Sequence, residues 1–211
     1  MKLLHIDSSI TGGASASRQV SAAIVAALAR ANPGLEIASR DLDADPIPHL
    51  DSARLASVRQ APPDAPTPTE ADIAANGAIL QQLLDADIVV IGAPMYNFTV
   101  PSQLKAWLDR ILVPGKTFSY SESGPVGLAG GKRVIVAMAR GGNYQPGQPN
   151  ALFDFQEPYL RAVFAFIGVE DIEFVRAEGL AFGPEPRAAA IEAALERAEA
   201  LADDPALSKA A

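Results

Sequence analysis

The segment Asp87-Ile88-Val89-Val90-Ile91-Gly92 runs straight into Pro94-Met95-Tyr96-Asn97-Phe98. Its unbroken β-branched run is typical of a strand that is buried on both faces, as in a parallel sheet. Two further apolar runs, 2–7 and 133–138, are likewise followed by loops with small residues, 8–17 and 139–144. Because parallel strands end at a common rim, we expect the three loops to converge there, where open α/β sheets bind ligands.

Apolar periodicity divides the rest of the chain into alternating strands and helices. Strands are expected over 2–7, 35–41, 87–92, 133–138 and 171–175, and helices over 17–31, 73–84, 101–114, 153–167 and 186–202. Two segments interrupt this alternation. Residues 43–68 are rich in Pro, Ala and Asp with one short helical candidate at 52–59, and residues 116–131 predict a small hairpin or flap. The Ala-rich tail after residue 202 is expected to fray.

This alternation predicts a doubly wound α/β sandwich, with a five-stranded parallel sheet and helices on both faces. We expect the flavodoxin-like strand order 2-1-3-4-5, because it places the first, third and fourth strands at the centre. Those three strands carry the converging loops. A length of 211 residues fits a single domain, residues 1–211, with a full hydrophobic core.

Composition excludes several classes of function. Acidic residues outnumber basic ones by 25 to 17, which gives a net charge of −8 and argues against nucleic acid and membrane surfaces as partners. We expect a cytoplasmic protein, since the sequence has neither a signal peptide nor a spanning run. The chain has no cysteine, so any redox chemistry needs a bound cofactor to carry the electrons.

The first loop is suited to an anion. It offers the hydroxyls of Ser8, Ser9, Thr11, Ser15 and Ser17 just before a helix, whose free N–H groups favour a phosphate monoester. An ordinary Ser-rich helix cap would explain the same residues. No Walker A motif occurs, and no Gly-x-Gly-x-x-Gly follows the first strand, so a cofactor with one terminal phosphate is favoured over a dinucleotide.

The other two loops are suited to a flat ring. Tyr96 and Phe98 provide aromatic surface, and the amide of Asn97 can donate and accept hydrogen bonds at a heteroaromatic edge. The same aromatic residues would also serve to cover the sheet rim or a dimer contact. In the third loop, Gly141 and Gly142 allow close approach of the backbone to a ligand.

Hydrolytic and metal chemistry have few candidates. The chain has only two histidines, His5 in a strand and His49 in a proline-flanked loop, and we interpret both as structural or exposed. The motif Gly-x-Ser-x-Gly is absent, and the carboxylates do not cluster at metal-ligand spacing. We therefore predict neither a metal site nor a catalytic acid or base.

These loops and several other segments resemble a known family, the FMN-dependent NADH azoreductases, which are flavodoxin-like and related to the NAD(P)H:quinone reductases. The similarity extends nearly from end to end. The segments that carry it are 7–10 with 15–17, 40–42, 46–48, 93–98 with 103–105, 115–118, 140–142, and 166–168 with 177–179. The Met-Tyr-Asn-Phe motif at 95–98 ahead of Gln-Leu-Lys is highly specific.

The resemblance implies where FMN binds. It assigns the cofactor to Ser9, Ser15, Ala16, Ser17, Met95, Tyr96, Asn97, Phe98, Ala139, Arg140, Gly141 and Gly142. Ala139 is a departure, because the family commonly has Ser before Arg-Gly-Gly, so one hydroxyl contact to the flavin is in question. Substrate contacts are assigned to Phe98, Tyr120, Tyr144 and Arg59.

The resemblance also implies a mechanism. NADH or NADPH reduces FMN, and a quinone or an aromatic azo compound then takes the reducing equivalents at the same face in a ping-pong sequence. The flavin N5 does the chemistry, while the protein stacks the ring, excludes water and donates hydrogen bonds. The choice between NADH and NADPH stays open. Discrimination needs a partner for the 2′-phosphate of NADPH, which Arg54 or Arg59 would provide unless both are solvated surface charges.

The family works as a homodimer in which the partner roofs each flavin. Trp107, residues 116–120 and residues 153–167 offer apolar surface for this, unless they complete the monomer core. The main alternative function is a flavodoxin-like electron carrier or redox sensor that does not oxidise NADH rapidly. The long segments 43–68 and 113–131 count against it, since a carrier exposes its flavin edge. A non-flavin acyl- or phosphate-binding protein is a third reading, and it would purify colourless.

Overall fold

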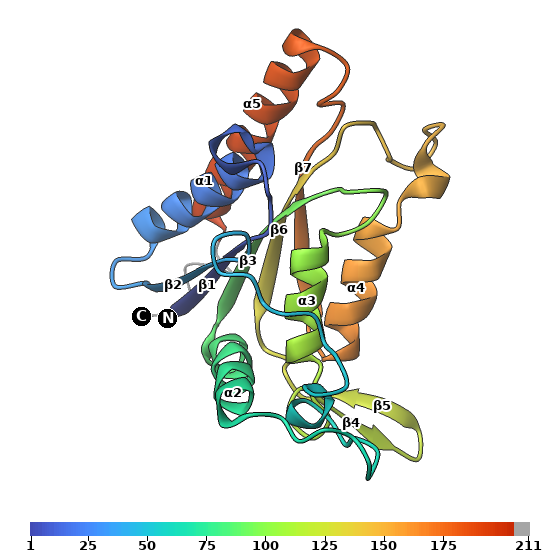
Figure 1. The fold of residues 1–211 in the computed structure, drawn as a ribbon. Coiled ribbons are helices and arrows are strands. Elements are labelled where there is room, and N and C mark those ends of the chain that lie inside the picture. The colour runs from blue at the N-terminus through green and yellow to red at the C-terminus, as the bar shows by residue number, and fades with distance from the viewer. Residues whose placement is uncertain (205–211) are drawn as a thin grey trace.

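The computed structural model describes residues 1–204, and its centre is a twisted parallel sheet (Figure 1). Five strands pair in the order β2-β1-β3-β6-β7: β2 (Glu36–Asp41), β1 (Lys2–Asp7), β3 (Ile88–Pro94), β6 (Arg133–Ala139) and β7 (Asp171–Ala177). All four pairings are parallel. The order 2-1-3-4-5 is thereby confirmed, because β4 (Phe118–Ser121) and β5 (Gly124–Gly127) form a separate antiparallel hairpin, as expected within 116–131.

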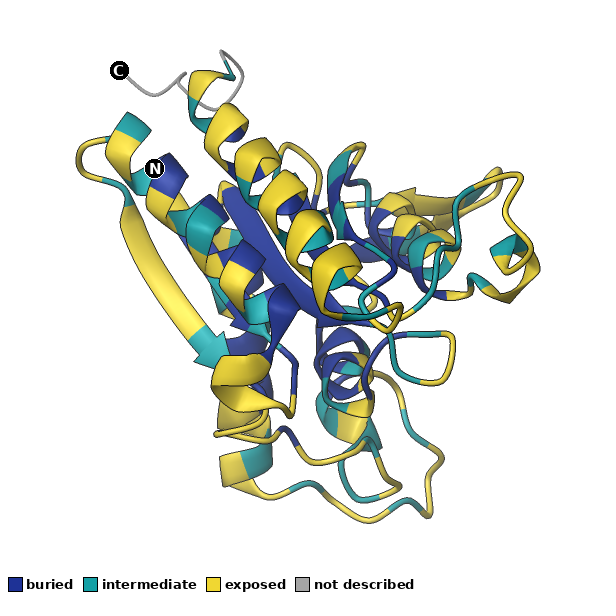
Figure 2. Cartoon of the chain, turned by 90° about the horizontal axis from the view of Figure 1, so that it is seen from above, coloured by how far each residue is buried: buried dark blue, intermediate teal, exposed yellow. Residues whose placement is uncertain are grey.

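Helices cover both faces of the sheet (Figure 1). On one face lie α1 (Ala16–Ala31) and α5 (Pro184–Ala200), and on the other α2 (Glu70–Asp85), α3 (Ser102–Ile111) and α4 (Gln156–Phe166). The central strands alternate between two apolar cores: Val90 packs with α1 and α5, and Val89 packs with α2, α3 and α4. Because each central strand faces an apolar core on both sides, its sequence is a continuous apolar run. In Figure 2 the central strands are buried, while β2 is an exposed edge.

Local capping moves some helix ends away from their predicted positions. The helix predicted at 153–167 begins only at Gln156, because the Asp154 carboxylate accepts hydrogen bonds from the N–H groups of Gln156 and Glu157 at 3.0 and 3.1 Å. The helix predicted at 73–84 begins earlier, since Thr69 caps it by accepting from Asp72 N. The short helix expected at 52–59 is a single 3₁₀ turn, Leu55–Ser57.

The hairpin segment lies at the amino ends of the sheet strands, whereas residues 43–68 start at the carboxyl end of β2 and run along α3, whose Arg110 donates to Pro48 O at 2.6 Å. The hairpin packs beside the end of α4, where Ala129 N donates to Ile167 O at 2.8 Å, and Figure 1 shows it at the opposite end of the sheet from the three loops. Trp107 is fully buried in the core of its own chain, so it completes the monomer. Among residues 1–204, no helix is both long and apolar enough to cross a membrane. The tail predicted to fray lies outside these residues, apart from its first few.

Candidate functional site

A pocket of about 320 Å³ lies where the three loops meet at the carboxyl ends of the strands. Six of the predicted FMN-binding residues line it together: Ser9, Ser15, Ala16, Met95, Tyr96 and Ala139. We call this pocket the loop crevice. Its position confirms that the loops following β1, β3 and β6 converge, since residues distant in sequence form one wall. Ala139 contributes a methyl group to this wall.

The first loop holds its hydroxyls in place by short contacts. Ser15 caps α1 by accepting from Arg18 N at 3.3 Å, and its hydroxyl lies 3.0 Å from that of Ser17. Ser9 Oγ lies 3.0 Å from Thr11 Oγ1. The loop therefore combines a helix N-terminus with several hydroxyls, which is the donor set that suits a phosphate group. Ser17 itself is buried and does not line the crevice.

Arg18 supports this loop from behind. Its guanidinium donates to Asp41 through two nitrogens at 2.6 and 2.7 Å, and to the Ser9 carbonyl at 2.7 Å. These hydrogen bonds lower the pKa of the Asp41 carboxyl to about 2 and raise the pKa of Arg18. Because its charge is already paired with a carboxylate, Arg18 holds the loop and leaves the loop's hydroxyls for a ligand.

The second loop is a tight turn in a strained conformation. Tyr96 and Thr99 pair across it, and Asn97 and Phe98 at its centre have φ of +48° and +73°. Asn tolerates this left-handed region, but for Phe it is a genuine outlier. Such strain persists where the surroundings fix it, commonly at ligand sites. Asn97 and Phe98 lie exposed beyond the crevice wall, and the Phe98 ring lies 5.4 Å from that of Phe153.

Tyr96 joins the second loop to the first. Its hydroxyl accepts from Ile10 N at 3.2 Å and lies 3.3 Å from Ser9 Oγ. Met95 N donates to Ala139 O at 2.8 Å, which joins the second loop to the third. The three loops thus form one hydrogen-bonded rim.

Arg140 belongs to the third loop but does not line the loop crevice. Its side chain is completely buried and faces carboxylates: Glu178 at 3.1 Å and Asp154 at 3.0 Å. Its backbone N–H donates to Ala177 O, and its carbonyl accepts from Leu180 N. The assignment of Arg140 as an FMN ligand stays untested, but its guanidinium is turned into the protein, where it anchors the third loop.

Gln156 links Arg140 to the second loop, and sequence reasoning missed it. Its side-chain carbonyl accepts from Arg140 Nε at 3.1 Å, and its amide donates to Ala93 O and Pro94 O at 3.1 and 3.0 Å. Gln156 is fully buried, so each of these bonds replaces one to water. Nothing in the local sequence distinguishes it from other helical glutamines.

Arg187 is a second residue that the sequence did not reveal. It comes from α5, more than 170 positions after the first loop, yet it lines the loop crevice and donates to Ala14 O at 3.1 Å. Thr11, Ala14, Pro94 and Leu180 complete the wall. Arg187 brings a positive charge to the hydroxyl-rich end of the crevice.

Some predicted residues lie elsewhere in this chain. Gly141 and Gly142 continue the third loop beyond the crevice wall. Tyr144 lines a neighbouring cavity of about 500 Å³ on the other side of that loop. Tyr120 is 74% exposed on the β4–β5 hairpin, and Arg59 follows the 3₁₀ turn that leads to α2. Neither Tyr120 nor Arg59 lines the loop crevice, and Figure 1 shows the hairpin that carries Tyr120 at the opposite end of the sheet.

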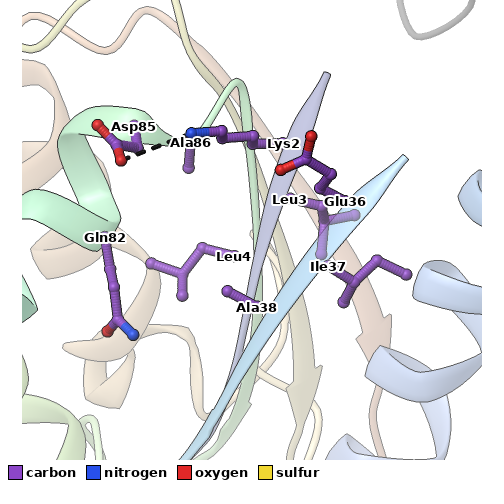
Figure 3. Close-up of a pocket in the computed structure, with 9 residues that line it drawn as sticks. All are labelled: Lys2, Leu3, Leu4, Glu36, Ile37, Ala38, Gln82, Asp85 and Ala86. Carbon is purple, nitrogen blue, oxygen red and sulfur yellow. Dashed lines mark ion pairs between the residues drawn. The ribbon is translucent and has the colours of Figure 1, made fainter. Parts of the chain in front are cut away.

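Other features of the described residues show no comparable chemistry. Figure 3 shows a cavity of about 240 Å³ between the β1–β2 edge and α2, where Lys2 and Asp85 form an ion pair at 3.7 Å. No predicted site residue lines it. His5 contacts Ser21 at 3.1 Å inside the fold, in keeping with a structural role. Within residues 1–204, no group of three or more His, Cys, Asp or Glu could hold a metal ion.

Comparison with known proteins agrees with this geometry. A family model described as the flavodoxin-like fold matches residues 1–202, so the chain belongs to the flavodoxin-like proteins. An FMN-dependent NADH:quinone oxidoreductase 2 of Bradyrhizobium diazoefficiens is 56% identical over 201 residues, which cover 95% of this chain and 98% of the relative. An FMN-dependent NADH:quinone oxidoreductase of Ralstonia nicotianae is 56% identical over 195 residues, 92% and 93% of the two chains. The chain therefore belongs to the family of FMN-dependent NADH:quinone oxidoreductases.

Solved structures give the same grouping. The azoreductase AzrA has a TM-score of 0.85 at 29% identity, covering 96% of this chain and 99% of its own. An FMN-dependent NADH-azoreductase from Bacillus anthracis str. Ames Ancestor, solved in complex with FMN, has a TM-score of 0.81 at 29% identity, covering 95% and 99%. The expected resemblance to azoreductases is confirmed.

Proposed function

We propose that this chain is an FMN-dependent oxidoreductase that passes reducing equivalents from NADH to quinones and aromatic azo compounds. The observation that carries the proposal is the loop crevice, in a chain more than half identical to enzymes of that name along nearly its whole length. The donor set of the crevice fits FMN. One end has hydroxyls, a helix N-terminus and Arg187 for a phosphate, and the other has Met95 and Tyr96 for a flat ring.

The chain's own residues have three tasks in this function. Ser9, Ser15 and Arg187 would hold the phosphate. The backbone N–H groups of the strained turn at Asn97 and Phe98 would orient the ring edge. Met95 and Tyr96 would pack against the ring and exclude water. When bound, FMN supplies the hydride acceptor and donor that no side chain of this cysteine-free protein provides.

We propose that a second copy of the chain completes the substrate side of the crevice. Tyr120 and Arg59, which the family resemblance assigns to substrate, do not line the crevice of their own chain, so a partner would have to supply them. A group of exposed apolar side chains beside the second loop supports this: Phe98, Leu152, Phe153 and Phe155. Light scattering should give twice the chain mass at micromolar concentration; a monomer mass would refute the dimer.

NADH is the expected reductant. Arg54, one candidate for a 2′-phosphate, already pairs with Asp72 at 2.8 Å and with Asp51, so its charge is neutralised. Arg59 is exposed in the same segment and remains the other candidate. We therefore expect NADPH to be the weaker substrate, and Arg59→Gln to reduce what NADPH activity there is. The cytoplasmic location stays a prediction.

Steady-state kinetics test the proposed function. The protein is purified, stripped of flavin and assayed for NADH oxidation with a benzoquinone, with and without added FMN. We expect activity to depend on FMN and double-reciprocal plots at several quinone concentrations to be parallel, as in a ping-pong sequence. An electron carrier would instead bind FMN and oxidise NADH no faster than free FMN does.

A further inference from the structure

A second cavity, away from the loop crevice, is lined by three arginines. Its volume is about 270 Å³, and it lies between the start of the 43–68 segment, α2 and the end of α3. Its walls include Arg40, Asp45, Pro48, Arg54, Asn76 and Arg110. It shares no residue with the loop crevice, so its chemistry is independent of flavin binding. We call it the arginine pocket.

Arg110 is the unusual member of the arginine pocket. Its side chain is 1% exposed, and its Nη2 donates to Pro48 O at 2.6 Å. Among the residues that the structure describes, Nε and Nη1 of Arg110 have no hydrogen-bond partner. Buried donors on a charged group are costly when they stay unpaired, and native proteins rarely leave them so. An external hydrogen-bond acceptor would therefore stabilise the Arg110 guanidinium, since the described residues provide none for Nε and Nη1.

The other two arginines have carboxylate partners. Arg54 pairs with Asp72 and Asp51, and Arg40 pairs with Asp45 at 3.3 Å. Within residues 1–204, Arg110 forms no ion pair with any carboxylate, so the pocket retains a positive charge on its buried wall. Burial, followed by repulsion from the Arg54 charge, lowers the pKa of Arg110, while Asp51, Asp109 and Asp72 raise it. An anion in the pocket would favour the charged guanidinium and so act against this lowering.

We propose that the arginine pocket binds a small tetrahedral oxyanion of the size of inorganic phosphate, and that Arg110, whose unpaired Nε and Nη1 are shielded from solvent behind the pocket wall, turns its guanidinium toward the ion. Guanidinium groups suit such oxyanions because their donors are planar and their charge is permanent. The pocket is smaller than the roughly 300–1,000 Å³ of sites for drug-sized ligands, which favours a free ion over an organic phosphate. A bound ion would hold residues 45–54 against α2 and α3.

Calorimetric titration with inorganic phosphate tests this site. The FMN-loaded protein is used in a chloride buffer, so that the phosphate end of the loop crevice is already filled. We expect saturable binding, a rise in melting temperature with phosphate, and roughly tenfold or greater weakening in Arg110→Met, which keeps the side-chain length and removes the charge. Glucose 6-phosphate in place of phosphate should bind more weakly; equal binding that depends on Arg110 would identify the ligand as an organic phosphate ester.

Two further variants keep the proposal falsifiable. Arg54→Gln leaves Arg110 in place but removes the charge that pairs with Asp51 and Asp72, so these carboxylates should repel an anion and weaken phosphate binding. This variant provides the test if Arg110→Met does not fold. Arg30→Gln removes one positive charge from the far helix α1 and should bind phosphate like the wild type. If the wild type shows no saturable binding, or if Arg110→Met and Arg54→Gln bind as well as Arg30→Gln does, the pocket holds only water and the proposal is wrong.

Discussion

Arg187→Gln should weaken FMN binding and leave riboflavin binding unchanged. Arg187 lies at the hydroxyl-rich end of the loop crevice, where its Nη2 donates to Ala14 O at 3.1 Å. The phosphate of FMN is the part of the cofactor that this charge would meet. Riboflavin has the same ring without the phosphate, so the two ligands separate the charge effect from damage to the crevice.

The magnitude follows from the exposure of the arginine. A hydrogen bond to a charged group contributes about 1.5–3 kcal/mol, and the half-buried position of Arg187 places its share at the lower end because solvent screens it. We therefore expect a loss of about 1–2 kcal/mol, which is roughly a five- to thirtyfold rise in the Kd for FMN. Ser9, Thr11 and Ser15 keep their hydroxyls, so binding should weaken without being abolished.

Quenching of flavin fluorescence gives both dissociation constants. Arg187→Lys keeps the charge and should retain most of the affinity, and Arg197→Gln on the same helix, where Arg197 pairs with Glu173, is the matched control. The difference between wild type and Arg187→Gln should shrink as salt is added, since screening acts over about 10 Å at 0.1 M. An equal loss for FMN and riboflavin, or no loss for FMN, would refute this role for Arg187.

Three further outcomes follow from the described contacts. Arg18 lowers the pKa of Asp41 to about 2, so the ion pair stabilises the fold above the ordinary carboxyl pKa and loses this effect as the pH falls toward 2. Asp41→Asn should therefore melt at a lower temperature than the wild type at pH 7, and the difference between the two melting temperatures should vanish near pH 2. Gln156→Met removes three buried hydrogen bonds, to Ala93 O, Pro94 O and Arg140 Nε, which should cost at least about 2 kcal/mol in urea unfolding and weaken FMN binding; unchanged unfolding would contradict this. Gly127→Ala places a Cβ 2.1 Å from Gly168 N, so the hairpin must shift, and thermal unfolding should show a clear loss of stability where Gly77→Ala, whose added Cβ meets open space, does not.

The fold could be predicted because its signals are local and repeated. Each central strand is an apolar run with cores on both sides, and the run at 88–91 identified the parallel sheet before any contact was known. Helix ends were less accurate, because side-chain caps such as those of Thr69 and Asp154 override apolar periodicity. The strand order followed from the requirement that the three loops meet.

The site was predictable in part. Ser9, Ser15 and Tyr96 could be found because their loops directly follow strands. Arg187 could not, since it reaches the crevice only through the packing of α5 beside α1. Arg140 was assigned to FMN through the family resemblance, and that assignment stays a prediction; no local pattern indicated that its guanidinium is buried beside Glu178 and Asp154.

The central claim is that the loop crevice holds an FMN that NADH reduces and a quinone or azo compound reoxidises. Visible absorbance of the FMN-loaded protein under anaerobic conditions tests it most directly. NADH is added first, and then a benzoquinone or an azo dye in the same cuvette. We predict rapid bleaching of the flavin bands, followed by their return when the acceptor is added. A bound flavin that NADH does not bleach would contradict the reductase and point to an electron carrier or sensor, and a protein that binds no FMN would contradict the site itself.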